Sequence, residues 1–307
     1  MNNKPIQHGN IDEKKNITYE PLVSIITPIL NQVGYVEECI QSVLNQSYPN
    51  IEHIFVDGVS TDGTLEVLAS YKAKYPDRIT FISAKDNSVY DAWNKGIIMS
   101  TGNILGWLGS DDTSPEGAIE AVVKCFTDHP DVSVVFGDCN VMDANGEMIS
   151  RVYSYDFDLK RSITTACPLY TPAVFFKREV VDRIGLLDTA LPASEFDYYI
   201  RAAKIFKLQR INKVLANFRL HKGGTTGSSG AMFMYAHDNY MVARKHGATL
   251  FSPRGRNYIL MSLTRPIRPL VAFLYNSKRL KPVLAPVYYL IVGRQGKVDY
   301  FDNGSSS

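Results

Sequence analysis

Residues Asn103–Gly117 read NILGWLGSDDTSPEG, and this stretch predicts the unit from which the fold is built. The apolar run 103–108 is typical of a buried strand, and the Ser-Pro-Glu of 114–116 supplies a cap, a first-turn proline and an acid for a following helix. Two adjacent carboxylates, Asp111 and Asp112, stand between them. Because neighbouring like charges repel, the pair needs a compensating partner, either the helix N-terminus or a bound cation.

Strand and helix patterns alternate on both sides of this stretch. The predicted strands are 22–27, 51–56, 78–83, 103–108 and 132–137, and the predicted helices are 35–46, 63–75, 90–100 and 115–126. Repeated strand–helix units are typical of a mostly parallel sheet with helices on both faces, so we expect an α/β fold. A chain of 307 residues with 45% hydrophobic content can bury a large core.

After residue 138 the alternation breaks. We expect a hairpin turning at Asn145-Gly146, a strand with a short helix in 172–185, a helix over 194–207 and a strand over 209–220. A Gly/Ser/Thr-rich loop follows at 221–230, and the rest is helical but interrupted by prolines. We therefore expect three regions: a disordered tail over 1–20, an α/β domain over 21–235 and a basic helical extension over 236–307.

Composition limits the compartment and the partners. The four cysteines form no CxxC pair, so neither a disulfide framework nor a zinc site is expected. The polar N-terminus lacks the apolar core of a secretory signal, and no window approaches about 18 uninterrupted apolar residues. We expect a cytoplasmic protein.

The net charge of +2 conceals an uneven distribution. From Asn239 onward, eleven Lys and Arg residues face two acids, Asp299 and Asp302, whereas the preceding part is acidic. This basic region could be a solvated extension, a nucleic-acid contact or a contact with an anionic leaflet. It has no recognised nucleic-acid motif, and it mixes Arg and Lys with Leu, Phe and Tyr as interfacial helices do. We favour peripheral contact with the inner face of a membrane and expect no nucleic-acid partner.

Acidic or hydroxyl residues follow each of the first four predicted strands. They are Thr27 with Pro28, Asp57, Asp86, and Asp111 with Asp112. Because the carboxyl ends of parallel strands share one edge of a sheet, these side chains predict a single polar cleft. Hard carboxylates placed together suit a divalent cation, although capping of the next helix would explain the pair on its own.

Three segments carry a resemblance to a known family. VDGVSTDGT at 56–64, YDAWNKGI at 90–97 and SDD at 110–112 occur in the order found in family 2 glycosyltransferases of the GT-A fold, and the similarity covers roughly 21–222. The chain is most similar to the branch that builds bacterial exopolysaccharide, O-antigen and related surface glycans. The resemblance implies inverting transfer of a hexose from a nucleotide-sugar, a UDP-sugar, to a saccharide or polyprenyl-linked acceptor.

The same resemblance assigns residues to the donor. Thr27, Pro28 and Asp57 match positions that line the nucleoside pocket, and Asp86 and Lys95 match positions near the nucleotide or the sugar. Asp111 would face the ribose or the sugar, Asp112 would coordinate Mn²⁺ or Mg²⁺ on the diphosphate, and His221 would meet the diphosphate or the metal. Such a cation stabilises the departing nucleoside diphosphate.

The general base is implied at the start of a helix, in ASEFDYYIRAAK. Glu195 occupies the base position, where the family usually has Asp, and Asp197 is the alternative two residues later. Both acids could instead serve the first turn of a helix capped by Ser194. Two rival functions stay open: a sugar nucleotidyltransferase, although TPILNQVGY lacks its Gly-rich loop, and a non-catalytic nucleotide-sugar-binding subunit.

Overall fold

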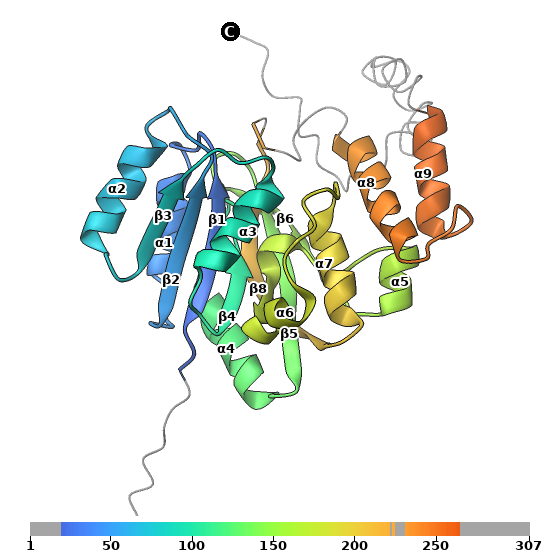
Figure 1. The fold of residues 1–307 in the computed structure, drawn as a ribbon, viewed down its shortest axis with the longest axis horizontal. Coiled ribbons are helices and arrows are strands. Elements are labelled where there is room, and N and C mark those ends of the chain that lie inside the picture. The colour runs from blue at the N-terminus through green and yellow to red at the C-terminus, as the bar shows by residue number, and fades with distance from the viewer. Residues whose placement is uncertain (1–19, 222, 225–230, 265–307) are drawn as a thin grey trace, which may run out of the picture.

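The structure is a computed structural model, and it describes residues 20–221, 223–224 and 231–264 (Figure 1). All but the last residue of the expected tail over 1–20, most of the Gly-rich loop and the greater part of the basic extension lie outside the described residues. The strands are β1 (Val23–Ile29), β2 (Ile51–Asp57), β3 (Ile79–Ser83), β4 (Ile104–Trp107), β5 (Val132–Met142), β6 (Met148–Val152), β7 (Val174–Lys177) and β8 (Lys207–Arg219). The helices are α1 (Val36–Leu44), α2 (Thr64–Lys74), α3 (Val89–Met99), α4 (Ala118–Asp128), α5 (Leu159–Thr164), α6 (Arg178–Ile184), α7 (Ser194–Ala203), α8 (Ala231–Lys245) and α9 (Pro253–Thr264), with a 3₁₀ turn at Thr171–Ala173.

The described strands form one mixed sheet in the order β3-β2-β1-β4-β7-β5-β6, with β8 paired to β5. Strands β1 to β4 are mutually parallel, which confirms the α/β architecture. Strand β7 is antiparallel to both β4 and β5, so β5 runs in the direction of β1 again, and its parallel partner β8 does too. The expected hairpin is β5–β6, where the Gly146 N–H donates to the Asp143 carbonyl and Gly146 has a φ of +86°.

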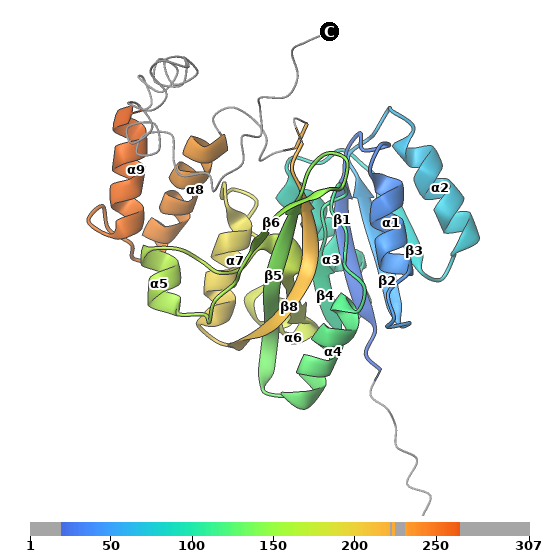
Figure 2. The same cartoon turned by 180° about the vertical axis from the view of Figure 1, so that it is seen from behind.

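Helices cover both faces of the sheet. On the face in Figure 1, apolar residues of α3, α6 and α7 pack on the inner strands, with Trp93 stacked on Trp107 at 4.7 Å between ring centroids. On the opposite face, shown in Figure 2, α1 and α4 pack through side chains such as Val43 and Phe126. Apolar runs such as VSIITPI in β1 are buried because both faces of the sheet are covered.

The start of α4 differs from the prediction. The helix begins at Ala118, preceded by Gly117 with a φ of +70°, and not at Pro115. The Gln46 side chain explains the difference, because its amide donates to the Ser114 and Pro115 carbonyls and its oxygen accepts from the Ile119 N–H at 3.3 Å. A residue distant in sequence thus caps this helix in place of Ser114.

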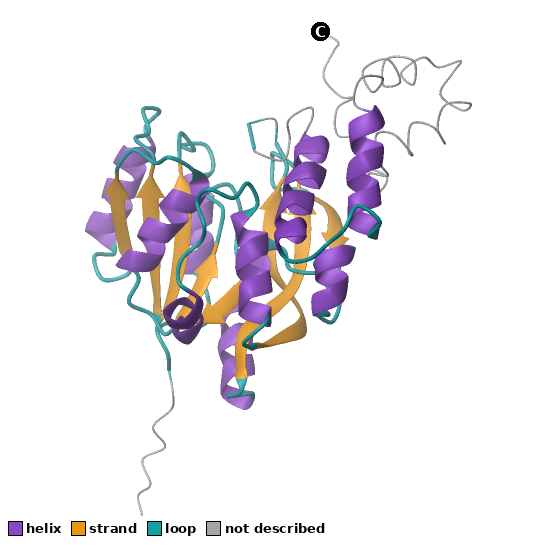
Figure 3. Ribbon diagram, turned by 45° about the vertical axis from the view of Figure 1, so that its right-hand side comes forward, coloured by secondary structure: helices purple, strands orange, loops and turns teal. Residues whose placement is uncertain are grey.

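Helix α8 packs on α7 through a small apolar cluster that includes Phe196, Ile200 and Val242. In Figure 3, α8 and α9 stand beside α7 and α5 at one end of the sheet. The boundary expected between residues 235 and 236 falls inside α8. Across the described ranges, no helix combines the length and apolar character needed to cross a bilayer.

Candidate active site

Sheet direction brings the predicted site residues to one edge. Strands β1 to β4 end at this edge, and β8 ends there at Arg219 because it runs in the same direction. Helix α7 ends at Ala203, just before β8 begins at the opposite edge, so the first turn of α7 lies at the same edge as the strand ends (Figure 1). The acids after β4 and the acids that start α7 therefore share one end of the molecule.

The Asp111–Asp112 pair is held by β8. Asp112 is buried, and its Oδ1 accepts a hydrogen bond from the Arg219 backbone N–H at 2.8 Å. Asp111 Oδ2 lies 2.8 Å from His221 Nε2. The remaining oxygens, Asp111 Oδ1 and Asp112 Oδ2, lie 2.9 and 2.6 Å from where a Cβ on Gly109 would stand. They therefore converge over the Gly109 backbone, and a side chain at this position would displace them.

This pair is electrostatically costly. Burial, together with the neighbouring Asp111 charge, raises the pKa of Asp112 from its ordinary 3.8 to about 8. Two oxygens that converge in this way can be bridged by a hard divalent cation, which would replace repulsion with attraction. The described residues contain no group of three or more His, Cys, Asp or Glu side chains arranged to hold a metal. Mg²⁺ commonly uses one or two carboxylates with substrate phosphates, so the pair fits a cation shared with a diphosphate.

Arg219, Tyr35 and Glu38 surround the pair and were missed by sequence reasoning. Arg219 Nε donates to the Asp111 carbonyl at 2.7 Å, and its Nη2 lies 2.5 Å from Glu38 Oε2. The Tyr35 ring lies against both the Arg219 guanidinium and the His221 ring. For Arg219 the signal available was its place at the end of a predicted strand, two residues before His221, since residues two apart in an extended chain point to the same side.

Two of the three predicted nucleoside residues, Thr27 and Asp57, are buried. Asp57 is fully buried, and its carboxylate accepts from the Val59 and Ser60 backbone N–H groups and from the Ser83 hydroxyl. It therefore shapes the β2–α2 connection, where Val59 has a φ of +70°. The Thr27 hydroxyl is also buried and lies 2.8 Å from His53 Nε2, whereas Pro28 is partly exposed.

Asp86 and Lys95 pair with each other. The Lys95 ammonium forms an ion pair with Asp86 and donates to the Lys85 carbonyl at 3.0 Å. The hydrogen bond to Asp86 raises the pKa of Lys95. Asp86 Oδ2 lies 3.5 Å from where a Gly58 Cβ would stand, which places this ion pair beside the end of β2.

Glu195 and Asp197 differ sharply despite being two residues apart. Glu195 Oε2 is buried and has no hydrogen-bond partner among the described residues, and burial raises the pKa of this carboxyl. Asp197 is fully buried but satisfied, with Arg201 Nε at 2.7 Å and His246 Nε2 at 2.8 Å from its oxygens. Asp197 therefore ties α7 to the end of α8, while Glu195 has an oxygen left to accept a proton.

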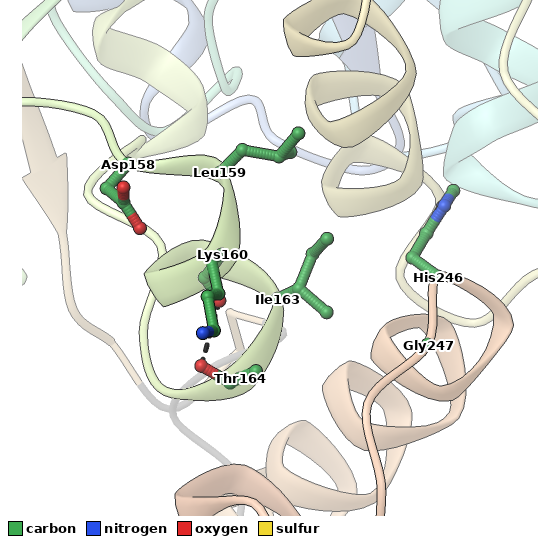
Figure 4. A pocket seen from close by; sticks show the side chains of 7 residues that line it. All are labelled: Asp158, Leu159, Lys160, Ile163, Thr164, His246 and Gly247. Atoms are coloured by element: carbon green, nitrogen blue, oxygen red, sulfur yellow. Dashed lines mark hydrogen bonds between the residues drawn. The ribbon is translucent and has the colours of Figure 1, made fainter.

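A cavity of about 520 Å³ lies between α5 and the residues that follow α8 (Figure 4). Its lining includes Leu159, Ile163 and His246. None of the predicted site residues lines it. The chemistry at the strand ends, and not this cavity, identifies the candidate active site.

Comparisons with known sequences agree with this geometry. A profile described as glycosyl transferase family 2 matches residues 24–185. An uncharacterized glycosyltransferase of Rickettsia typhi is 30% identical over 229 residues, which cover 70% of this chain and 69% of that protein. Chondroitin synthase of Escherichia coli is 28% identical over 214 residues, which cover 70% of this chain and 31% of the synthase. This chain thus spans less than a third of that synthase.

Solved structures share the fold. A mannosyltransferase from Pyrobaculum calidifontis, PcManGT in complex with GDP-Man and Mn²⁺, aligns with a TM-score of 0.58 and 20% identity over 89% of this chain and 70% of that one. S. aureus TarS 1-349 in complex with UDP-GlcNAc aligns with a TM-score of 0.55 and 15% identity over 88% and 87% of the two chains. Both neighbours confirm the GT-A fold expected from the sequence.

Proposed function

The chain belongs to glycosyl transferase family 2, and from this premise we propose that it transfers a hexose from a UDP-sugar to a saccharide or polyprenyl-linked acceptor, with inversion, in surface glycan synthesis. The observation that carries the proposal is that a cation-binding acid pair and a candidate base lie at the same edge of the sheet, where the parallel strands end. Asp111 and Asp112 form a crowded pair suited to a cation, and Glu195 keeps a buried oxygen without a partner among the described residues.

The donor would bind at the ends of β1, β2 and β4. Asp112 and His221 would hold Mn²⁺ or Mg²⁺, and the cation would supply positive charge to the leaving diphosphate. Asp111 would orient the ribose or the sugar while holding the His221 ring. The nucleoside and sugar contacts are assigned to Pro28, Asp86 and Lys95. The buried side chains of Asp57 and Thr27 would support the pocket from inside, Asp57 through the β2–α2 connection and Thr27 through His53.

The transfer itself is a single displacement. The acceptor hydroxyl oxygen bonds to the anomeric carbon while the bond from that carbon to the phosphate oxygen breaks, and its electron pair leaves with the nucleoside diphosphate. The hydroxyl proton passes to Glu195 Oε2. A base is more effective when its pKa approaches the working pH, and burial moves the pKa of Glu195 in that direction. Asp197 lacks this freedom because Arg201, Lys245 and His246 occupy its oxygens.

The comparisons support the substrate classes in this proposal. PcManGT and TarS were solved with GDP-Man and UDP-GlcNAc, which supports a nucleotide-sugar donor, and the PcManGT complex holds Mn²⁺. Hyaluronan synthase of Pasteurella multocida, 27% identical over 214 residues that cover 70% of this chain and 22% of that one, supports a saccharide acceptor. We choose uridine over guanosine because the sequence is most similar to the branch of the family that builds bacterial surface glycans.

We also propose that the protein works in the cytoplasm, against the inner face of the membrane, through its basic C-terminal region. The described part of this region exposes large apolar side chains, with Phe251 89% and Leu263 72% accessible. Arg256 is exposed on the same helix as Leu263. Exposed apolar groups with cations are the combination that binds an anionic leaflet.

The test compares two first-turn glutamates. Glu195 lies in the first turn of α7 and Glu179 in the first turn of α6, so a role limited to the helix dipole would make their substitutions equivalent. We expect Glu195→Gln to lower turnover of a panel of UDP-hexoses by about 10²- to 10⁴-fold while calorimetric UDP binding is retained. Glu179→Gln should leave turnover unchanged. Equal turnover in both variants would remove Glu195 as the base, and retained donor binding without turnover in the wild type would indicate a non-catalytic subunit.

A further inference from the structure

Four residues form a closed ring of contacts that includes Asp111 of the acid pair. Asp111 Oδ2 lies 2.8 Å from His221 Nε2, and the His221 ring lies 4.8 Å from the Tyr35 ring, centroid to centroid. The Tyr35 ring in turn lies 5.0 Å from Arg219 Cζ, and Arg219 Nε returns to the Asp111 carbonyl at 2.7 Å. The ring joins the β1–α1 loop, the end of β4 and the end of β8.

Arg219 also makes several contacts outside this ring. Its side chain is only 1% exposed, yet its guanidinium also reaches Glu38 and the carbonyls of Asp143 and Ala144 in the β5–β6 turn. Its backbone N–H holds Asp112 Oδ1. A guanidinium presents five donors in a rigid planar fork, whereas an ammonium offers a compact charge on a flexible stem. Only arginine can therefore serve these separate segments at once.

The Tyr35 ring acts through stacking. One of its neighbours is the Arg219 guanidinium and another is the His221 imidazole, so it limits how far either plane can turn. His221 Nε2 is already committed to Asp111, which leaves Nδ1 as the other imidazole nitrogen. The orientation of that nitrogen therefore depends on Tyr35.

We propose that Arg219 and Tyr35 are positioning residues of the donor site, and that they hold Asp111, Asp112 and His221 in the arrangement that receives a cation with its diphosphate. The inference rests on the proposed function, because it takes Asp112 and His221 as the cation-binding groups. Residues that orient metal ligands from behind change metal affinity by about 10- to 100-fold when they are substituted. That range sets the size of the expected effect.

The experiment titrates Mn²⁺ into the full-length protein in the presence of UDP and measures unbound Mn²⁺ by its electron paramagnetic resonance signal. Arg219→Met and Arg219→Lys should both weaken Mn²⁺ binding by about 10- to 100-fold. The lysine variant keeps the positive charge, so its weaker binding would show that the planar set of guanidinium donors is what holds the site. The matched control is Arg210→Met, on the same strand, where the arginine bonds Ser154 and Asp138 away from the acid pair. It should bind Mn²⁺ as the wild type does.

Tyr35 provides a second test that does not depend on a buried charge. Tyr35→Leu removes the ring and should weaken Mn²⁺ binding about 10-fold, whereas Tyr35→Phe keeps the ring and should bind normally. Unchanged binding in both Arg219→Lys and Tyr35→Leu would overturn the inference. So would an equal loss in Arg210→Met, because general destabilisation would then explain it. If the wild type binds no Mn²⁺ with UDP, the proposed function fails before the positioning residues are tested.

Discussion

Replacing Asp112 with asparagine should stabilise the metal-free protein, even though it removes a proposed functional group. The carboxyl of Asp112 ionises near pH 3.8 in the unfolded chain, but its pKa is about 8 in the folded state because of burial and the Asp111 charge. One pKa unit corresponds to about 1.4 kcal/mol, so at pH 7 the folded state carries a cost of up to about 4 kcal/mol at this residue. An asparagine carries no charge, and its amide oxygen can still accept from the Arg219 N–H.

The sign of the pH dependence follows from the direction of this shift. A raised carboxyl pKa means that the folded state binds the proton more tightly. Ionisation of Asp112 therefore lowers the free energy of unfolding as pH rises from about 4 to about 8. The assay is urea unfolding in a chelating buffer at pH 5 and pH 8. Asp112→Asn should unfold with a higher free energy than the wild type, by up to about 5 kcal/mol at the higher pH and less at the lower.

A second buried aspartate provides the control. Asp138 is also fully buried, but hydrogen bonds from Ser154 and Arg151 overcome the effect of burial and hold its pKa below the ordinary range. Asp138→Asn should therefore destabilise the protein by about 3 kcal/mol, because it breaks a satisfied ion pair. If Asp112→Asn is destabilising in the same assay, or keeps the pH slope of the wild type, the electrostatic reasoning about the acid pair is refuted.

Three further results are expected. The acid limb of the pH profile of kcat/KM should lie above the ordinary glutamate pKa of 4.5, because burial raises the pKa of Glu195, and full activity down to pH 4.5 would contradict this. Asp197→Asn should lower the free energy of unfolding by about 3 kcal/mol while turnover per folded molecule is kept, and a selective loss of turnover would make Asp197 the base. His53 has a pKa lowered to about 3 by burial and by Arg78, so the folded state should lose stability as pH falls below about 6.5, and His53→Gln should reduce that slope in acid unfolding curves.

Much of the fold could be predicted from the sequence because its signals are local. Apolar runs of strand length and helical spacing depend on neighbouring residues, and they predicted β1 to β5 and α1 to α4. The start of α4 was wrong because Gln46, distant in the chain, satisfies the groups that Ser114 was expected to cap. The antiparallel insertion of β7 between β4 and β5 also depends on pairing that local patterns do not encode.

In the candidate site, too, local signals could be read from the sequence and contacts between distant segments could not. Residues at strand ends could be predicted to share an edge, because parallel strands end together. The sequence could not predict that Glu195 has an oxygen free of partners among the described residues while Asp197 is fully paired, because the pairing of Asp197 depends on His246 and Lys245 at the end of α8. Arg219 was missed because its importance comes from contacts with three segments that meet only in the folded chain.

Nucleotide binding tests the central claim most directly. Calorimetric titrations of UDP, GDP and CDP, each with and without Mn²⁺, should show that the wild type binds UDP and requires Mn²⁺ to do so, and that Asp112→Asn abolishes this binding. Binding of none of these nucleotides by the wild type under either condition, or equal UDP binding by Asp112→Asn with Mn²⁺ present, would contradict a donor site built on the acid pair.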